Sequence, residues 1–157
     1  MSATWPASAN VVVDASVAVW TVLPVLAGVD PLPHFVAWRQ QGQEIIAPAH
    51  WAAEATSAIR RSVYLKVISP EEGLQAITDL YALDVELIVP DAQLCHSAQN
   101  WAGRLGQSKA YDGFYVALSE QLAAEFWTAD KRWPMVRNRL AQPGCTGWVK
   151  ISPFSRL

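Results

Sequence analysis

Four carboxylic acids in this sequence stand beside segments that could bring them together. Asp14 ends the apolar run NVVVD, and Asp130 ends the run AEFWTAD. Asp112 begins the helix-forming stretch DGFYVALSEQ, and Glu54 lies within HWAAEATSAIRR. Carboxylate oxygens without His or Cys suit Mg²⁺ or Mn²⁺. A divalent cation held by these acids is therefore the first feature to test against the rest of the sequence.

Short apolar runs alternate with helical patterns along the chain. The predicted strands are residues 10–14, 44–48, 85–90, 124–130 and 147–151. The predicted helices begin near Ser16, at Asp112 and within the segments 32–42, 50–66, 69–83 and 92–106. This alternation predicts an α/β fold, a three-layer α/β/α sandwich with a mainly parallel sheet of about five strands. The length suits one core, so we expect residues 1–157 to form a single domain.

A parallel sheet would gather the four acids at one edge. Ligands of open parallel sheets bind beyond the carboxyl ends of the strands, and Asp14 and Asp130 both lie at such ends. Glu54 and Asp112 lie on neighbouring helices that could reach the same edge. Four carboxylates in one place repel one another unless a divalent cation compensates their charge. The pattern therefore predicts a metal site formed by all four.

Each acid also has a purely structural interpretation. Asp14 could be the N-cap of the helix near Ser16, and Asp112 or Asp130 could be a cap or first-turn acid. Glu54 stands among alanines, where a single acid is often a solvated helix position. The ordered agreement of all four favours a site over these separate explanations.

Charge and composition narrow the class of protein further. The net charge of −2 argues against a strongly basic nucleic-acid binder. Residues 67–103 carry six acids and no Lys or Arg, whereas residues 104–157 carry eight basic residues and four acids, which is compatible with a phosphate partner. Cys95 and Cys145 form no metal-binding motif, and no apolar run approaches membrane-spanning length. We therefore expect a cytoplasmic protein with no membrane association.

The motifs that contain these acids are similar to those of a known family. They are VVVDAS, APAHWAAEATSAIRR, AYDGFYVALSE and FWTADKR, in this order and over nearly the whole chain. Through them the chain resembles the PIN-domain nucleases, and within these the short toxin ribonucleases of VapBC toxin–antitoxin pairs. The chain departs from the family pattern at Ser57, where Asn is frequent, and at Gly113, where a better helix former is common and where Gly could loosen the first helical turn.

The resemblance implies a function and a set of site residues. Asp14, Glu54, Asp112 and Asp130 would be the catalytic and metal-binding quartet, with the Ser16 and Thr128 hydroxyls in support. The implied activity is Mg²⁺-dependent cleavage within RNA, with Mn²⁺ as a substitute, by the toxin of a toxin–antitoxin pair. Its implied partners are RNA, a cognate antitoxin and a second copy of the chain in a homodimer.

Basic residues near the acids are candidates for holding RNA. They are Arg60 and Arg61 on the helix of Glu54, and Lys131, Arg132, Arg137 and Arg139 after Asp130. Each of them could equally be a solvated surface charge. His34, His50 and His96 share no ligand spacing, so we expect packing or surface roles for all three.

Two other function classes remain compatible with the sequence. One is a PIN-fold module that binds RNA or protein without cleavage, which the departures at Ser57 and Gly113 keep open. The other is an unrelated Mg²⁺-dependent phosphatase, although DAS lacks the second Asp of a DxD nucleophile motif.

Overall fold

The described part of the chain has six α-helices and five strands in the predicted order. The computed structural model describes residues 10–26, 30–130 and 149–151. The strands are β1 (Asn10–Val13), β2 (Glu44–Pro48), β3 (Glu86–Ile88), β4 (Glu125–Thr128) and β5 (Val149–Ile151). The helices are α1 (Ala15–Val22), α2 (Leu32–Gln40), α3 (Trp51–Tyr64), α4 (Pro70–Ala82), α5 (Ala92–Arg104) and α6 (Tyr111–Gln121), with a 3₁₀-helix, η1, at Pro24–Leu26.

All five strands form one sheet in the order β3-β2-β1-β4-β5. The central strand β1 pairs in parallel with β2 and with β4, and β2 pairs in parallel with β3. Only β5 is antiparallel, against β4. The predicted α/β class with a mainly parallel sheet is confirmed. Because β1, β2 and β4 run in one direction, the chain leaves all three at the same edge of the sheet.

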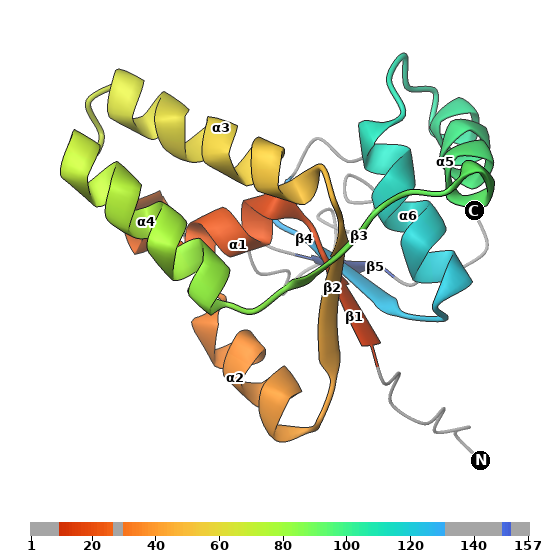
Figure 1. The fold of residues 1–157 in the computed structure, drawn as a ribbon, viewed down its shortest axis with the longest axis horizontal. Coiled ribbons are helices and arrows are strands. Elements are labelled where there is room, and N and C mark those ends of the chain that lie inside the picture. The colour runs from red at the N-terminus through yellow and green to blue at the C-terminus, as the bar shows by residue number, and fades with distance from the viewer. Residues whose placement is uncertain (1–9, 27–29, 131–148, 152–157) are drawn as a thin grey trace, which may run out of the picture.

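Helices cover both faces of the central strand (Figure 1). Val11 and Val13 belong to a core cluster with Phe35 and Trp38 of α2. Val12, between them, belongs to the larger core cluster, which draws side chains from α3, α4, α5 and α6. Successive side chains of a strand point to opposite faces, and all three valines are fully buried. The continuous apolar sequence of β1 therefore follows from its place in the middle layer of a sandwich.

Helices α3 and α4 form a helical hairpin, in which α4 packs against α3, the helix that carries Glu54 (Figure 1). Ser69 caps α4 with a capping box: its Oγ accepts a hydrogen bond from the Glu72 N–H at 3.1 Å, and Glu72 Oε2 accepts one from the Ser69 N–H at 2.6 Å. A Cβ at Gly73 would lie 2.6 Å from the Val63 side chain. The two helices therefore approach closely just after the turn that joins them.

Gly113 is needed for the packing of α6 on α5. A Cβ at this position would lie 2.3 Å from the Ala98 carbonyl oxygen and 3.2 Å from the Ala102 nitrogen, both in the backbone of α5. The sequence suggested only a weaker first helical turn at this glycine. The structure shows that the absence of a side chain lets α6, with Asp112, lie directly against its neighbour.

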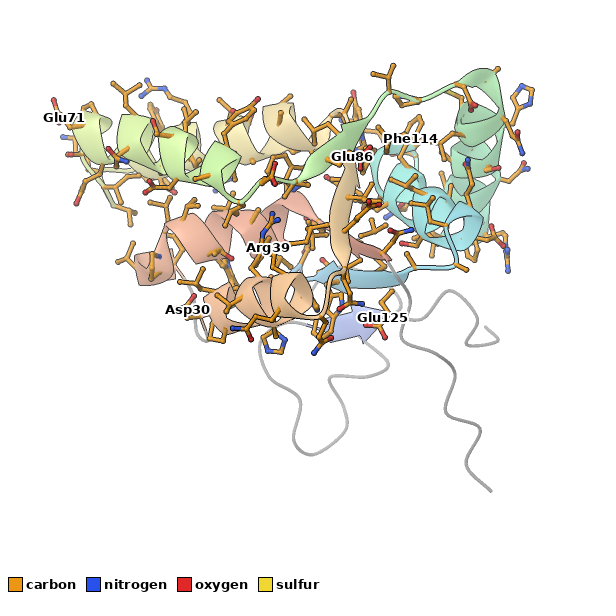
Figure 2. All side chains as sticks on the ribbon, turned by 60° about the horizontal axis from the view of Figure 1, so that its bottom comes forward. Asp30, Arg39, Glu71, Glu86, Phe114 and Glu125 are labelled. Carbon is orange, nitrogen blue, oxygen red and sulfur yellow. The ribbon has the colours of Figure 1, made fainter. Side chains whose placement is uncertain are left out.

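Arg39 connects α2 to the turn that follows α4 (Figure 2). Its Nη1 lies 3.4 Å from Asp84 Oδ2, and its Nη2 donates hydrogen bonds to the carbonyl oxygens of Leu83 and Asp84. Asp84 has a positive φ of 54°, a conformation that Asp adopts more readily than most residues. The guanidinium thus holds the two carbonyl groups of a sharp turn and joins two layers of the sandwich.

Candidate functional site

The four predicted acids line one hollow at the carboxyl edge of the sheet. This hollow, which we call the acidic hollow, has a volume of about 470 Å³. It is lined by Asp14, Ala15, Ser16, His50, Ala53, Glu54, Ser57, Ala58, Tyr111, Asp112 and Asp130. The acids come from four separate segments: the ends of β1 and β4 and the first turns of α3 and α6. The convergence expected from the sequence is therefore present.

Asp14 is both a helix cap and the most buried acid of the hollow. Its backbone N–H donates to the Trp127 carbonyl at 3.0 Å, which extends the pairing of β1 with β4 by one residue. Its Oδ1 accepts a hydrogen bond from the Ser16 N–H at 2.7 Å, as an N-cap of α1 does. Its side chain is buried. The cap interpretation of this residue is thus confirmed, and the cap fixes the carboxylate at the rim of the acidic hollow, where the predicted site would be.

Thr128 and Ser16 connect the ends of β1 and β4. The Thr128 hydroxyl donates to Asp14 Oδ2 at 2.7 Å and accepts from the Asp130 N–H at 3.0 Å. Ser16 Oγ accepts from the Ala129 N–H at 3.0 Å. These bonds hold the segment after β4 against the start of α1. Both hydroxyls therefore join the ends of β1 and β4, and the support of a metal site that the resemblance implies for them stays a prediction.

Glu54 is held by an aromatic residue of α6. The Tyr115 hydroxyl donates to Glu54 Oε2 at 2.6 Å, although the two residues are 61 positions apart. The Tyr115 ring is 1% exposed and stacks on Phe126, with ring centroids 5.7 Å apart. His50 Nε2 lies 3.8 Å from the same Oε2 and has no hydrogen-bond partner among the described residues. Glu54 is therefore held by one hydrogen bond from Tyr115, and the His50 nitrogen faces the same carboxylate oxygen without a hydrogen bond to it.

Asp112 is held by the loop that precedes α6. Gln107 Nε2 donates to Asp112 Oδ2 at 2.7 Å. The loop leaves α5 through Gly106, whose φ of +66° suits glycine, and the Gln107 N–H returns to the Ala102 carbonyl at 2.9 Å. This helix ending directs the Gln107 amide toward the start of α6. Asp112 itself lies in the first turn of α6 rather than at the N-cap, which is Ala110.

Burial and mutual repulsion shift Asp14 and Glu54 toward their protonated forms. Burial raises the pKa of Asp14 from 3.8 to about 6, against the lowering effect of its hydrogen bonds from Ser16 and Thr128, and the charge of Glu54 adds to the rise. Burial also raises the pKa of Glu54, with the charges of Asp112 and Asp130 adding to it and the Tyr115 hydrogen bond opposing it. The pKa of His50 is lowered, mainly by burial. The acidic hollow is thus a place where a positive charge would be stabilised.

The donor set of the acidic hollow fits a divalent cation in its chemistry, since four carboxylates line one space. Carboxylates from four segments face one space, and their charges act on one another through it. In the described ranges, no three His, Cys, Asp or Glu side chains are already grouped closely enough to hold a metal ion. Each of three acids is instead engaged by a neighbour: Asp14 by Thr128, Glu54 by Tyr115 and Asp112 by Gln107. To bind one cation, the carboxylate oxygens along this wall would have to turn toward a common point in the hollow.

The outcomes for the remaining predicted residues are mixed. Arg60 and Arg61 lie exposed on α3, beyond Glu54. Lys131, Arg132, Arg137 and Arg139 lie outside the described residues, and the single-domain prediction for residues 1–157 also extends over such segments. Ser57 lines the acidic hollow, so the departure from the family pattern keeps a polar side chain at this wall. No helix within the described ranges is long and apolar enough to cross a membrane.

Four residues near the site were missed or misjudged from the sequence. His50 was expected only to pack or to lie on the surface, yet it lines the acidic hollow; its spacing of four from Glu54 puts both on one helix face. Tyr115 follows Asp112 by three positions, the spacing that places a side chain on the same face of α6. Gln107 and Lys109 precede Asp112 in the loop and gave no recognisable pattern. For His34, ring contacts with Trp38 and Trp127 agree with the packing role.

Comparison with known proteins adds two findings. No family model matches the chain. Over 124 residues the chain is 34% identical to "Ribonuclease VapC12" of Mycobacterium tuberculosis (strain CDC 1551 / Oshkosh). The aligned region covers 78% of this chain and 88% of that protein. The protein of the same name from Mycobacterium tuberculosis (strain ATCC 25618 / H37Rv) matches to the same extent.

Proposed function

The chain belongs to the PIN-domain family of VapC-type ribonucleases, and from this premise we propose that it is a Mg²⁺-dependent endoribonuclease, the toxin of a toxin–antitoxin pair. The observation that carries the proposal is the acidic hollow, where Asp14, Glu54, Asp112 and Asp130 line one wall from four distant segments. Carboxylates that raise one another's pKa are costly to keep together without a cation. A cation bound by these carboxylates would offset that cost, which accounts for their convergence.

Asp14 and Asp112 would be the principal ligands of the cation. Glu54 and Asp130 would bind a second ion or orient the attacking water. When bound, Mg²⁺ would polarise the scissile phosphate, lower the pKa of water and offset negative charge that develops in the reaction. Mn²⁺ would substitute, because it accepts the same oxygen ligands.

Neighbouring side chains keep these carboxylates in place. Thr128 and Ser16 hold Asp14 and the segment that leads to Asp130, and Tyr115 holds one oxygen of Glu54. Each bond uses one lone pair of a carboxylate oxygen, and the remaining lone pairs of the carboxylate stay available for ligation. Ordered carboxylates reduce the reorganisation that binding and reaction require.

Arg60 and Arg61 are the described cations of α3 that we propose to contact RNA phosphates, together with Lys131 and Arg132 beyond the described residues. Each phosphate contact that is lost should lower the slope of log affinity against log salt by ~0.7 for single-stranded RNA. An RNA affinity and salt slope that are both unchanged in the double variant Arg60→Ala, Arg61→Ala would remove this pair from the contact surface.

A cognate antitoxin and a second copy of the chain are the proposed protein partners, and the cytoplasm is the proposed location. The hairpin of α3 and α4 exposes large apolar side chains, including Tyr64 at 74%, Leu74 at 70% and Tyr81 at 61%. Exposed apolar surface of this kind favours protein contacts. Light scattering at high concentration should show a dimer, and a strict monomer would contradict the homodimer alone.

The deciding experiment is cleavage of total cellular RNA by purified protein that is free of antitoxin. Discrete fragments should form with Mg²⁺ or Mn²⁺, disappear with chelator, and disappear in Asp14→Asn and Asp112→Asn. The matched control is Asp79→Asn, the same change at an exposed acid of α4, which should cleave like the wild type. Full activity in either site variant would defeat the assignment of the carboxylates.

Thermal unfolding without RNA separates metal binding from catalysis. Mg²⁺ should raise the melting temperature of the wild type more than that of Asp112→Asn, because a cation that binds only the folded state stabilises it. A metal-dependent rise together with no cleavage of any RNA would favour the binding-only PIN module. No rise and no cleavage would reject the metal site itself.

A further inference from the structure

A second hollow adjoins the acidic one on the side of the loop between α5 and α6. Its volume is about 450 Å³, within the range of pockets that hold small ligands. One wall is formed by Glu54 and Asp112, and the other by residues 106–109 and Tyr111. We call it the loop hollow. The roles discussed so far leave its loop wall unused, apart from the hydrogen bond of Gln107 to Asp112.

The two hollows are continuous along a shared rim. Glu54, Tyr111 and Asp112 line both of them. A polymer whose phosphate reaches the carboxylates must continue into a space that opens directly beside them. The loop hollow meets this requirement, because two of the proposed catalytic acids form its wall.

The loop wall differs from the acidic wall in its chemistry. It presents the amide of Gln107, the hydroxyl of Ser108 and the ammonium of Lys109, with no acid other than the two at the shared rim. Amide and hydroxyl groups can hydrogen-bond the edges of an unpaired base, and Lys contacts phosphate or sugar. This wall is therefore suited to a nucleotide, whereas the opposite wall is suited to a cation.

Tyr111 provides a flat apolar surface at the rim between the hollows. The residue is 56% exposed, although its neighbour Tyr115 on the same helix is 1% exposed. Its ring lies against the His50 ring, with centroids 5.7 Å apart, so it has a defined support on the protein side. Unpaired RNA bases stack on exposed aromatic rings, which favours single-stranded RNA as the ligand.

From this juxtaposition we propose that the loop hollow binds the nucleotide next to the scissile phosphate, with its base stacked on Tyr111 and its backbone contacted by Lys109. The inference rests on the proposed ribonuclease function and extends it to a subsite that would influence which step of the RNA is cut. Ser108 and Gln107 would contact the base edge. A single-stranded segment is required, since a paired base has both faces covered by its neighbours in the helix.

The test uses a fluorophore-labelled single-stranded RNA of mixed sequence, with binding followed by anisotropy in Mg²⁺. The Asp14→Asn background prevents cleavage during the measurement. Tyr111→Ala should weaken binding about tenfold through loss of stacking, whereas Tyr111→Phe should retain most of the affinity because the ring remains. Lys109→Ala should weaken binding and lower the salt slope by ~0.7, the value for one phosphate contact.

Matched controls exclude a general surface effect. His96→Ala removes an exposed aromatic ring from α5, away from the residues that line either hollow, and Lys66→Ala removes an exposed lysine from the turn after α3. Both should bind RNA like the Asp14→Asn parent. Equal affinities of Tyr111→Ala and His96→Ala would overturn the proposal, as would a Tyr111→Phe variant that binds as weakly as Tyr111→Ala.

A second readout uses the otherwise wild-type chain, with cut sites mapped on total cellular RNA. Tyr111→Ala should change the distribution of cut sites as well as the rate, since the subsite would no longer select its nucleotide. A lower rate with an unchanged distribution would assign Tyr111 a structural role and overturn the subsite. If the wild type cleaves nothing in either metal, the ribonuclease proposal itself fails, so the two failures are distinguishable.

Discussion

The two halves of the acidic hollow are built in different ways. The sheet half contains Asp14, Thr128 and Asp130 at the ends of adjacent strands, and the pairing of β1 with β4 sets its geometry. The helix half contains Glu54 and Asp112, and it depends on how α3, α5 and α6 pack. In the half that is fixed by backbone pairing, a side-chain change should remove a bond without displacing the strands. A half that is fixed by helix packing should respond to a change of a single methyl group.

The largest expected effect concerns the pH dependence of the sheet half in metal-free protein. The pKa of Asp14 is about 6 in the folded chain and near 3.8 in the unfolded chain. The protonated side chain therefore adds to the free energy of unfolding in full below pH 3.8, and this contribution is lost as the pH rises through 6. The shift from 3.8 to about 6 corresponds to at most ~3 kcal/mol. Asp14→Asn should remove this part of the pH dependence.

Urea unfolding of chelator-treated protein at several pH values between 4 and 7 measures this effect. Asp91→Asn is the matched control, because it makes the same change at the N-cap of α5, where the side chain is exposed. Equal pH profiles for Asp14→Asn and the wild type would show that burial of Asp14 has no energetic consequence.

The second effect tests the helix half through Gly113→Ala. The added methyl group would meet the Ala98 carbonyl oxygen at 2.3 Å, and a backbone atom cannot move aside as a flexible side chain can. We expect a loss of ~1 to 3 kcal/mol in the free energy of unfolding and reduced cleavage, as α6 moves with Asp112. Gly103→Ala on α5 meets no atom within 4 Å, and it should be neutral or stabilising by up to ~1 kcal/mol. Similar values for the two variants would reject the close contact.

The third effect concerns the connection within the sheet half. Thr128→Val keeps the shape of the side chain but removes the donor to Asp14 and the acceptor for the Asp130 N–H. We expect ~1 to 2 kcal/mol of destabilisation and slower metal-dependent cleavage. Thr21→Val is the control, since it is also buried and loses only a bond to the Val17 carbonyl within α1. Cleavage that falls equally in both variants would point to general destabilisation.

The smallest effect tests the tyrosine of the helix half. Tyr115→Phe removes the hydrogen bond to Glu54 and keeps the ring that packs on Phe126. We expect ~1 kcal/mol or less in stability, and about tenfold slower cleavage because Glu54 loses its orientation. Binding of Mg²⁺, measured by titration calorimetry, should weaken as well. Unchanged cleavage and metal affinity would show that Glu54 needs no support from α6.

Comparison of sequence with structure shows which parts of the site follow local rules. The positions of Asp14 and Asp130 could be predicted because every parallel strand delivers its carboxyl end to the same edge. The predicted strand at residues 10–14 ends one residue early in the structure, since Asp14 caps α1 instead of continuing β1. The predicted strand is one residue too long because Asp14 turns out of β1. Its carboxylate then caps α1 and lines the acidic hollow.

The partners of the carboxylates could not be predicted in the same way. Tyr115 has the spacing of a core residue, and it is indeed buried, but its hydroxyl finds Glu54 only because α3 and α6 meet. The role of Gly113 likewise depends on the α5 backbone lying beside it. Single-residue propensities describe one helix at a time and contain no information on which faces of two helices come into contact.

The sequence by itself determined the layered α/β fold and the order of four acids along it, because strand and helix periodicities and the direction of parallel strands are local properties. Only the tertiary structure decided how those acids are held. It placed Tyr115 against Glu54, directed Gln107 to Asp112, and opened the loop hollow beside them. Some of these contacts join segments that are remote in the chain, and others depend on the backbone conformation at Gly106. Packing of the folded chain determines both the remote contacts and that conformation.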